Sequence, residues 1–182
     1  MRQVDLVFKT NLLEQNLKAT CLRVLDRFQL PDLRLLCYFD DENPESLRPL
    51  GEFLCGLHTP VIGSGDLFLP GYVNGCFFDY STGDIRFDNL VYLCGRASAS
   101  ETGTAITFAH ELQHFVQYGT LRKVWKANSL IYGILRDGPP TPIKPWDIPL
   151  EKDAMAISKT VATLVLGEEA VKKHNQGRDI RQ

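Results

Sequence analysis

The pattern of apolar and polar positions divides the 182-residue chain into helical and extended segments. Apolar residues recur at intervals of three and four positions in the segments 11–29, 45–57 and 123–135, which predicts a helix in each of them. A continuous apolar run at 33–39 predicts a buried strand. The stretch 60–94 is strand-like and is interrupted by Gly, Pro, Asn and Ser turn signals, so we expect several short strands there.

A further helix with clear end signals is predicted between Ser98 and Gly119. Ser98 and Glu101 fit a capping box at its start, and Ser100 is a competing N-cap. Gly119 stands where a C-terminal stop is expected. Polar residues in the middle of this apolar helix are costly to bury unless they have partners, and a metal ion would supply such partners.

The middle of this helix carries the sequence His-Glu-Leu-Gln-His at positions 110–114. Residues four apart lie on one helix face, about 5–6 Å apart, so His110 and His114 can direct two ring nitrogens at one zinc ion. Glu111 lies next to them and can act as a base toward a metal-bound water. The pattern predicts a metal-dependent hydrolase. The alternative is that both imidazoles only pack or hydrogen-bond on a buried helix face.

A catalytic zinc usually has three protein ligands, so a third ligand is expected elsewhere in the chain. The segment that starts at Asp147 predicts a helix with Asp147 as its cap and Pro149 in its first turn. Glu151 falls in that first turn, and Asp153 is a shorter competitor. We favour Glu151 for its reach and its helix face, and the small Ala154 would allow this helix to approach the histidines.

HExxH followed by a later helix reading Glu-x-x-Ala resembles the gluzincin branch of zinc metallopeptidases, including ImmA/IrrE-like minimal domains. The resemblance covers residues 106–118 and 149–158. It implies an α+β, zincin-like fold in which a small, mostly antiparallel or mixed sheet packs on helices around a central HExxH helix. It also implies that His110, His114 and Glu151 bind one catalytic zinc ion, while Glu111 activates water.

The chain departs from related patterns at two informative positions. Many gluzincins carry Asp or Asn directly after the Ala, where it orients a ligating histidine, whereas this chain has Met155. The orienting role is therefore vacant or is filled from elsewhere. Peptide deformylases combine HExxH with an upstream cysteine, but Cys94 lies in Val-Tyr-Leu-Cys-Gly, which is typical of a strand end. A packed free thiol is the better interpretation of Cys94.

Composition narrows the classes of protein that remain. The chain fits one domain of residues 1–182, with a loose C-terminal tail expected at 171–182. A net charge of −2 argues against nucleic-acid binding, and no apolar run is long enough to cross a membrane. Five widely spaced cysteines in apolar surroundings favour reduced thiols and a cytoplasmic location.

The expected function is zinc-dependent hydrolysis of peptide bonds in a restricted protein or peptide substrate. The substrate would lie extended beside a strand edge, which we expect in the region 83–94 because that strand precedes the histidine helix in related folds. The alternative is a weak or inactive zincin-fold domain that binds zinc and acts as a sensor or interaction module. A structural helical protein with a coincidental motif is a third possibility, and no pattern predicts an oligomeric state.

Overall fold

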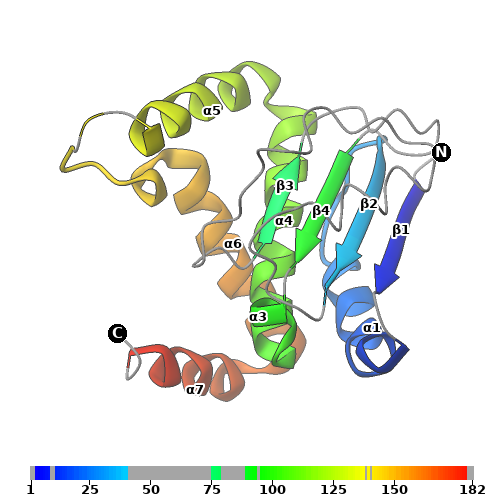
Figure 1. The fold of residues 1–182 in the computed structure, drawn as a ribbon. Helices are drawn as coiled ribbons and strands as arrows, with labels where there is room; N and C mark the ends of the chain where they lie inside the picture. The colour runs from blue at the N-terminus through cyan, green and yellow to red at the C-terminus, as the bar shows by residue number, and fades with distance from the viewer. Residues whose placement is uncertain are drawn as a thin grey trace.

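The protein has a mixed α+β fold in which a small sheet packs on helices (Figure 1). The structure is a computed structural model, and it describes residues 3–8, 11–40, 75–78, 89–93, 95–137, 139 and 141–179. The predicted helix at 45–57, the strand-like residues 60–74 and Cys94 lie outside the described residues.

The sheet has four strands in the order β1-β2-β4-β3. Strands β1 (Gln3–Phe8), β2 (Arg34–Phe39) and β4 (Asn89–Leu93) are parallel, and only β3 (Gly75–Phe78) pairs antiparallel with β4. The sheet is mixed, but the prediction that it is mostly antiparallel is wrong. An open strand edge was expected in the region 83–94, and for its described residues this is wrong, because they form β4, which lies between β2 and β3.

The burial of the inner strands agrees with a mainly parallel sheet. Every residue of β4 is buried, and all but the first residue of β2 are buried. Strands of this kind are near-continuous apolar runs, which is typical of inner strands in parallel sheets. The turn signals in the sequence favour hairpins between neighbouring strands, and among the described strands only β3 and β4 form an antiparallel pair.

The N-terminal strand β1 was not predicted from the sequence. It alternates in the way a half-buried strand does, with Val4, Leu6 and Phe8 packed against the hydrophobic core. Helix α1 (Asn11–Leu25) then connects β1 to its parallel neighbour β2, so the three elements form a β-α-β unit. The helix was predicted over 11–29 but ends four residues earlier.

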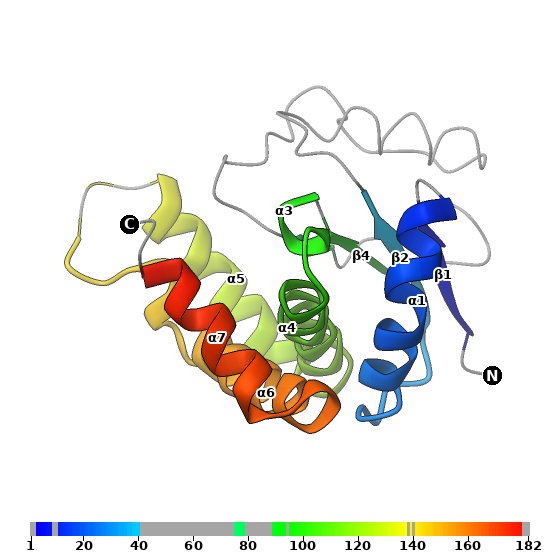
Figure 2. The same cartoon turned by 90° about the horizontal axis from the view of Figure 1, so that it is seen from below.

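Helix α4 (Glu101–Thr120) carries the HExxH sequence and lies on the same face of the sheet as α1 (Figures 1 and 2). The side chain of Ser100 caps it by accepting a hydrogen bond from the backbone N–H of Gly103 at 3.0 Å. Ser98 instead belongs to the short helix α3 (Gly95–Ser98). Ser100 is therefore the N-cap of α4 in place of the predicted Ser98, because the chain is already helical at Ser98.

Gly119 does not terminate the helix, contrary to the prediction. Helix α4 continues through Gly119 to Thr120, and its C-cap is Leu121. Gly119 instead allows a close approach to Pro31, since a Cβ atom at this position would lie 2.6 Å from two atoms of the proline ring. The glycine therefore allows α4 to pack closely against the segment that leads into β2, and it does not end the helix.

The C-terminal half of the chain is helical and lies beside α4. Helix α5 (Arg122–Asp137) follows α4, and a 3₁₀ turn (Pro145–Asp147) precedes α6 (Pro149–Leu166) and α7 (Glu168–Asp179). Figure 2 shows α4 between α1 on one side and α6 on the other. The loose tail expected at 171–182 is instead helical as far as Asp179.

A polar contact ties three helices together near the start of α4. Glu101 accepts hydrogen bonds from Thr20 at 2.5 Å and from the guanidinium of Arg23 at 3.0 Å. Arg23 also donates to the backbone oxygen of Val165 at 2.9 Å. Helix α1 therefore holds the N-terminus of α4 and the C-terminal end of α6, which fixes the two helices relative to each other at one end.

Cysteines within the described core behave as packed thiols, as predicted. Cys21 and Cys37 are free and buried. Burial raises the pKa of the Cys21 thiol to about 12, and burial together with the nearby Cys21 and Asp5 raises the pKa of Cys37 well above its usual value. In the part of the chain that the structure describes, no helix is both long and apolar enough to cross a bilayer.

Candidate metal centre

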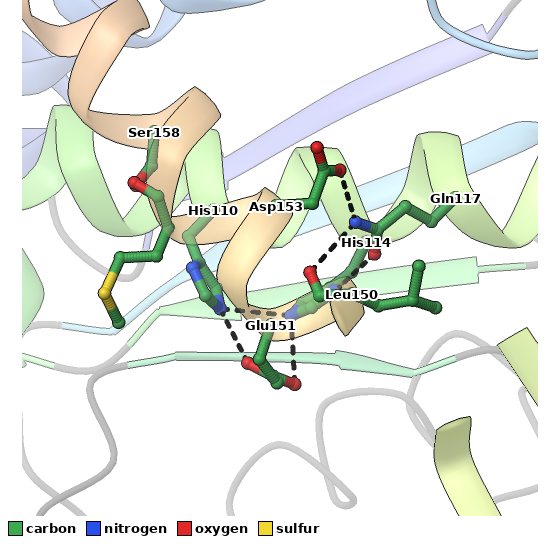
Figure 3. Close-up of polar contacts among 8 residues, drawn as sticks. His110, His114, Gln117, Leu150, Glu151, Asp153 and Ser158 are labelled. Atoms are coloured by element: carbon green, nitrogen blue, oxygen red, sulfur yellow. Dashed lines mark hydrogen bonds and ion pairs between the residues drawn. The ribbon is translucent and has the colours of Figure 1, made fainter. Parts of the chain in front are cut away.

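His110 and His114 lie one helical turn apart on α4 and turn their rings toward the same point (Figure 3). Their Nε2 atoms are 3.0 Å apart, and the ring planes are nearly perpendicular. The side chain of His110 is 20% exposed, and that of His114 is 7% exposed. The predicted convergence of two ring nitrogens is therefore confirmed, with one face of the pair open to the surface.

Glu151 reaches this histidine pair from the first turn of α6, as the sequence predicted. Its carboxylate oxygens lie 3.3 Å from Nε2 of His110 and 3.4 Å from Nε2 of His114. The three residues form a group whose potential ligand atoms all lie within 4.8 Å of one another. It is the one group of this kind found within the described ranges, so residues about forty positions apart in sequence make one site.

The size of this group fits a metal ion. In a tetrahedral zinc site with bonds of 2.0–2.1 Å, neighbouring ligand atoms lie about 3.3 Å apart, by simple geometry from those bond lengths. The two ring nitrogens lie 3.0 Å apart, and Glu151 places its Oε2 atom 3.3 Å from Nε2 of His110 and its Oε1 atom 3.4 Å from Nε2 of His114. Two imidazole nitrogens and a carboxylate oxygen are also a ligand set that zinc accepts. These residues could therefore hold a zinc ion without a large rearrangement.

The electrostatics of the group favour positive charge between the three side chains. Burial acts to raise the pKa of the Glu151 carboxyl, but the hydrogen bonds and charges of the two histidines outweigh it and lower the pKa to about 2. Burial acts to lower the pKa of His114, yet the contacts with Glu151 and the charge of Glu111 raise it. The site thus stabilises a carboxylate beside a cation, and a metal ion could take the place of the proton.

Helix α6 begins in a way that suits an acid in its first turn. Pro149 is the first helical residue, as predicted, because its missing N–H has no partner to lose there. The N-cap is Ile148 and has no side-chain cap, so the prediction that Asp147 caps the helix is wrong. The Asp147 carboxylate instead accepts from the backbone N–H of Lys144 at 3.1 Å. The carboxylate of Glu151 remains favoured there by the helix dipole.

Asp153, the rival candidate for the third ligand, is occupied elsewhere. Its Oδ2 atom accepts a hydrogen bond from the Gln113 amide at 2.7 Å and another from the Gln117 amide at 2.8 Å. It does not belong to the group of potential metal ligands. The preference for Glu151 over Asp153 is therefore supported by the positions of both side chains.

Gln117 is a residue of the site that the sequence did not reveal. It is 1% exposed, and its Oε1 atom lies 2.8 Å from Nδ1 of His114. Its amide nitrogen donates to the backbone oxygen of Leu150 at 3.0 Å as well as to Asp153 (Figure 3). The sequence feature that could have identified it is its spacing, because Gln117 stands three residues after His114 and therefore lies on the same helix face. Met155, where an orienting acid was expected, is 43% exposed.

Two further residues surround the histidines. Glu111 is buried with 6% exposure, and its negative charge contributes to the raised pKa of His114. Trp125 of α5 packs edge-on against the His114 ring, with the ring centroids 5.5 Å apart. Sequence reasoning missed Trp125, since it lies on the next helix and outside the motif. Its indole shields one side of His114 and helps to fix the ring.

In comparisons with known proteins, no family model, curated protein or solved structure matches this chain. What the molecule itself offers is a group of three side chains that two helices bring to one point.

Proposed function

We propose that this protein is a zinc-dependent metallopeptidase of the zincin type, with His110, His114 and Glu151 as ligands of one zinc ion. The observation that supports the proposal best is the convergence of two ring nitrogens and one carboxylate, whose nearest separations of 3.0, 3.3 and 3.4 Å are close to the edge length of a tetrahedral zinc site. HExxH on the central helix, with the third ligand on a following helix, is the arrangement of the gluzincin branch. The central position of α4 in an α+β domain agrees with a minimal zincin-like fold.

Each residue of the site has a distinct role in this proposal. A zinc ion at this position would lower the pKa of a water molecule and polarise the carbonyl of the scissile bond. Glu111 serves as the general base, because it follows the first ligand directly on the same helix. Its carboxylate takes the proton from the attacking water and delivers it to the leaving amine. The ligands themselves do not exchange protons during the reaction.

The substrate in this proposal is an extended segment of a protein or peptide. Such a segment binds by adding a strand to a sheet edge. Among the described strands β1 and β3 are at the edges, and β3 contacts helix α4. Strand β3 (Gly75–Phe78) is therefore the better candidate than β4 for the strand that the substrate extends. A small domain of this kind suits a restricted set of substrates rather than general proteolysis.

The proposal is tested with the variant Glu111→Gln. The variant keeps all three ligands, so we expect it to retain one zinc per chain in metal analysis while cleavage of a peptide library falls by about 100-fold or more, the range of general-base catalysis. A chelator should abolish the activity of the wild type, and added zinc should restore it. Cleavage by Glu111→Gln at the wild-type rate would remove Glu111 from the mechanism. A purified wild-type protein without metal would remove the proposal as a whole.

A second candidate function is a zinc-binding module without catalysis. The observation in its favour is the burial of Glu111, since a base with 6% exposure has little open surface through which to meet a substrate. Such a module would bind zinc and would cut none of the library, with or without added metal. Cleavage therefore separates the two functions, because both of them predict bound zinc.

A further inference from the structure

We infer that Gln117 and Asp153 hold His114 as the tautomer that carries its proton on Nδ1, so that Nε2 keeps the lone pair needed for a metal ion. The inference rests on the proposed function, because a metal ion is what makes the lone pair on Nε2 necessary. Gln117, on the histidine helix itself, then orients His114. In many gluzincins an acid or amide at the position of Met155 has this role. Gln117 and Asp153 are positioning residues, since neither belongs to the metal-ligand group.

The orientation of the Gln117 amide follows from its partners. Its nitrogen lies within hydrogen-bond distance of the Leu150 backbone oxygen and of the Asp153 carboxylate, at 3.0 and 2.8 Å. Both partners are acceptors here, because a backbone oxygen can only accept and the Asp153 oxygen already accepts from the Gln113 amide. The amide nitrogen must face these two acceptors. The other end, Oε1, must then face His114.

The amide orientation in turn fixes the proton of His114. An amide oxygen can only accept, so the contact of 2.8 Å between Oε1 and Nδ1 is a hydrogen bond only when Nδ1 carries the proton. A neutral imidazole has one protonated nitrogen, and Nε2 is then left with its lone pair. Nε2 is the atom that faces His110 and Glu151. The other tautomer, with its proton on Nε2, would place the lone pair of Nδ1 against a lone pair of the buried Gln117 Oε1 atom.

This arrangement makes one turn of α6 responsible for two functions. Glu151 supplies the third ligand, while Asp153, two residues later, determines which way the Gln117 amide points. The N-terminal end of α6 therefore provides one ligand and also orients another ligand on α4. Partners of this kind around metal-binding histidines usually change metal affinity by 10–100-fold when they are removed.

Gln113 offers a matched control for Gln117. It is the same residue type on the same helix, and its amide donates to the same Asp153 oxygen at 2.7 Å. It lies one turn before Gln117 and has no hydrogen bond to an imidazole among the contacts described. The variant Gln113→Met therefore removes an amide from Asp153 without removing the acceptor of His114.

The test compares Gln117→Met with Gln113→Met in the full chain. We expect zinc affinity, measured by competition with a chromogenic chelator, to fall by about 10–100-fold in Gln117→Met and by less than about 3-fold in Gln113→Met. The absorption spectrum of the cobalt-loaded protein should change in Gln117→Met alone. Circular dichroism verifies that both variants are folded. Equal zinc affinity in the two variants would overturn the inference.

A second measurement uses the unchanged protein and does not depend on the folding of a variant. Nitrogen-15 NMR of the metal-free wild type, at a pH where the imidazole is neutral, should show His114 protonated on Nδ1. A proton on Nε2 would overturn the inference. Neither readout requires catalysis, so a protein with this tautomer that cleaves nothing would contradict the proposed peptidase function while leaving the inference intact.

The role of Asp153 is tested by exchanging the donor and the acceptor in the Gln117–Asp153 pair. Gln117→Glu keeps an acceptor for His114, but it places a second carboxylate against Asp153. The double variant Gln117→Glu/Asp153→Asn replaces that repulsion with an amide donor, so it should bind zinc more tightly than Gln117→Glu alone. No gain in the double variant would show that Asp153 does not act through Gln117.

Discussion

The two sides of helix α4 differ in what they bury. The side that faces the sheet and α1 carries large apolar residues with no exposure, among them Phe108, Leu112 and Phe115. The side that faces the first turn of α6 carries His114 and Gln117, which are also buried but polar. One helix therefore contributes to a dry core on one side and to a hydrogen-bonded cluster on the other.

The difference shows that the two sides are specified in different ways. Apolar packing on the sheet side depends on volume, and a side chain of similar size can replace another at modest cost. The polar side depends on complementary donors and acceptors, since a buried group that loses its partner costs about 1–3 kcal/mol. We therefore expect changes on the sheet side to alter stability with little effect on metal binding, and changes on the polar side to alter metal binding first.

The largest effect on stability is expected for Phe108→Ala on the sheet side. Phe108 is fully buried and meets Phe39 of β2 edge-on, with ring centroids 5.2 Å apart. Its truncation should lower the free energy of unfolding by about 3–5 kcal/mol, which urea denaturation of the metal-free protein would measure. Zinc affinity of the folded protein should change little. A large loss of zinc affinity with unchanged stability would show that the two sides of α4 are not separate.

The converse effect is expected for His110→Ala on the polar side. The variant loses one of three ligands, so zinc affinity should fall by more than about 100-fold, beyond the range for partners that only orient a ligand. Its metal-free stability should fall by less than that of Phe108→Ala, because His110 is partly exposed and Glu151 keeps its contact with His114. Zinc should raise the melting temperature of the wild type and fail to raise that of the variant. His174→Ala on α7 serves as the control histidine.

The sequence was sufficient for the parts of the site that follow a local spacing. His110 and His114 are one turn apart, and Glu151 stands in the first turn of a helix that Pro149 helps to start. Gln117 has the same helical spacing, but its role depends on Asp153 and on a backbone oxygen of another helix. No pattern within one segment could identify that role, because the partners meet only in the folded chain.

The errors in the predicted fold have a similar origin. Strand direction in the sheet depends on which strands become neighbours, and β2 and β4 are neighbours although about fifty residues separate them. The expectation of a mostly antiparallel sheet came from the resemblance to zincin-like domains, and turn signals report only on adjacent segments. Strand β1 was missed because polar Gln3 and Asp5 interrupt its apolar run and because it gains its burial from contacts with α1 and β2. Local patterns therefore predicted elements better than their arrangement.

Gly119→Ala gives the smallest of these effects and tests how tightly the sheet side of α4 is packed. Alanine is the better helix former by about 1 kcal/mol, so the substitution would stabilise an unconstrained helix. The added Cβ would lie 2.6 Å from two ring atoms of Pro31, however, and a proline ring cannot rotate away. Such overpacking costs about 1–3 kcal/mol, so we expect a net loss of unfolding free energy. The loss should be smaller in the background of Pro31→Gly, which removes the ring. A more stable Gly119→Ala protein would mean that helix propensity outweighs the contact, and that the packing on this side is looser than the close approach of Gly119 to Pro31 implies.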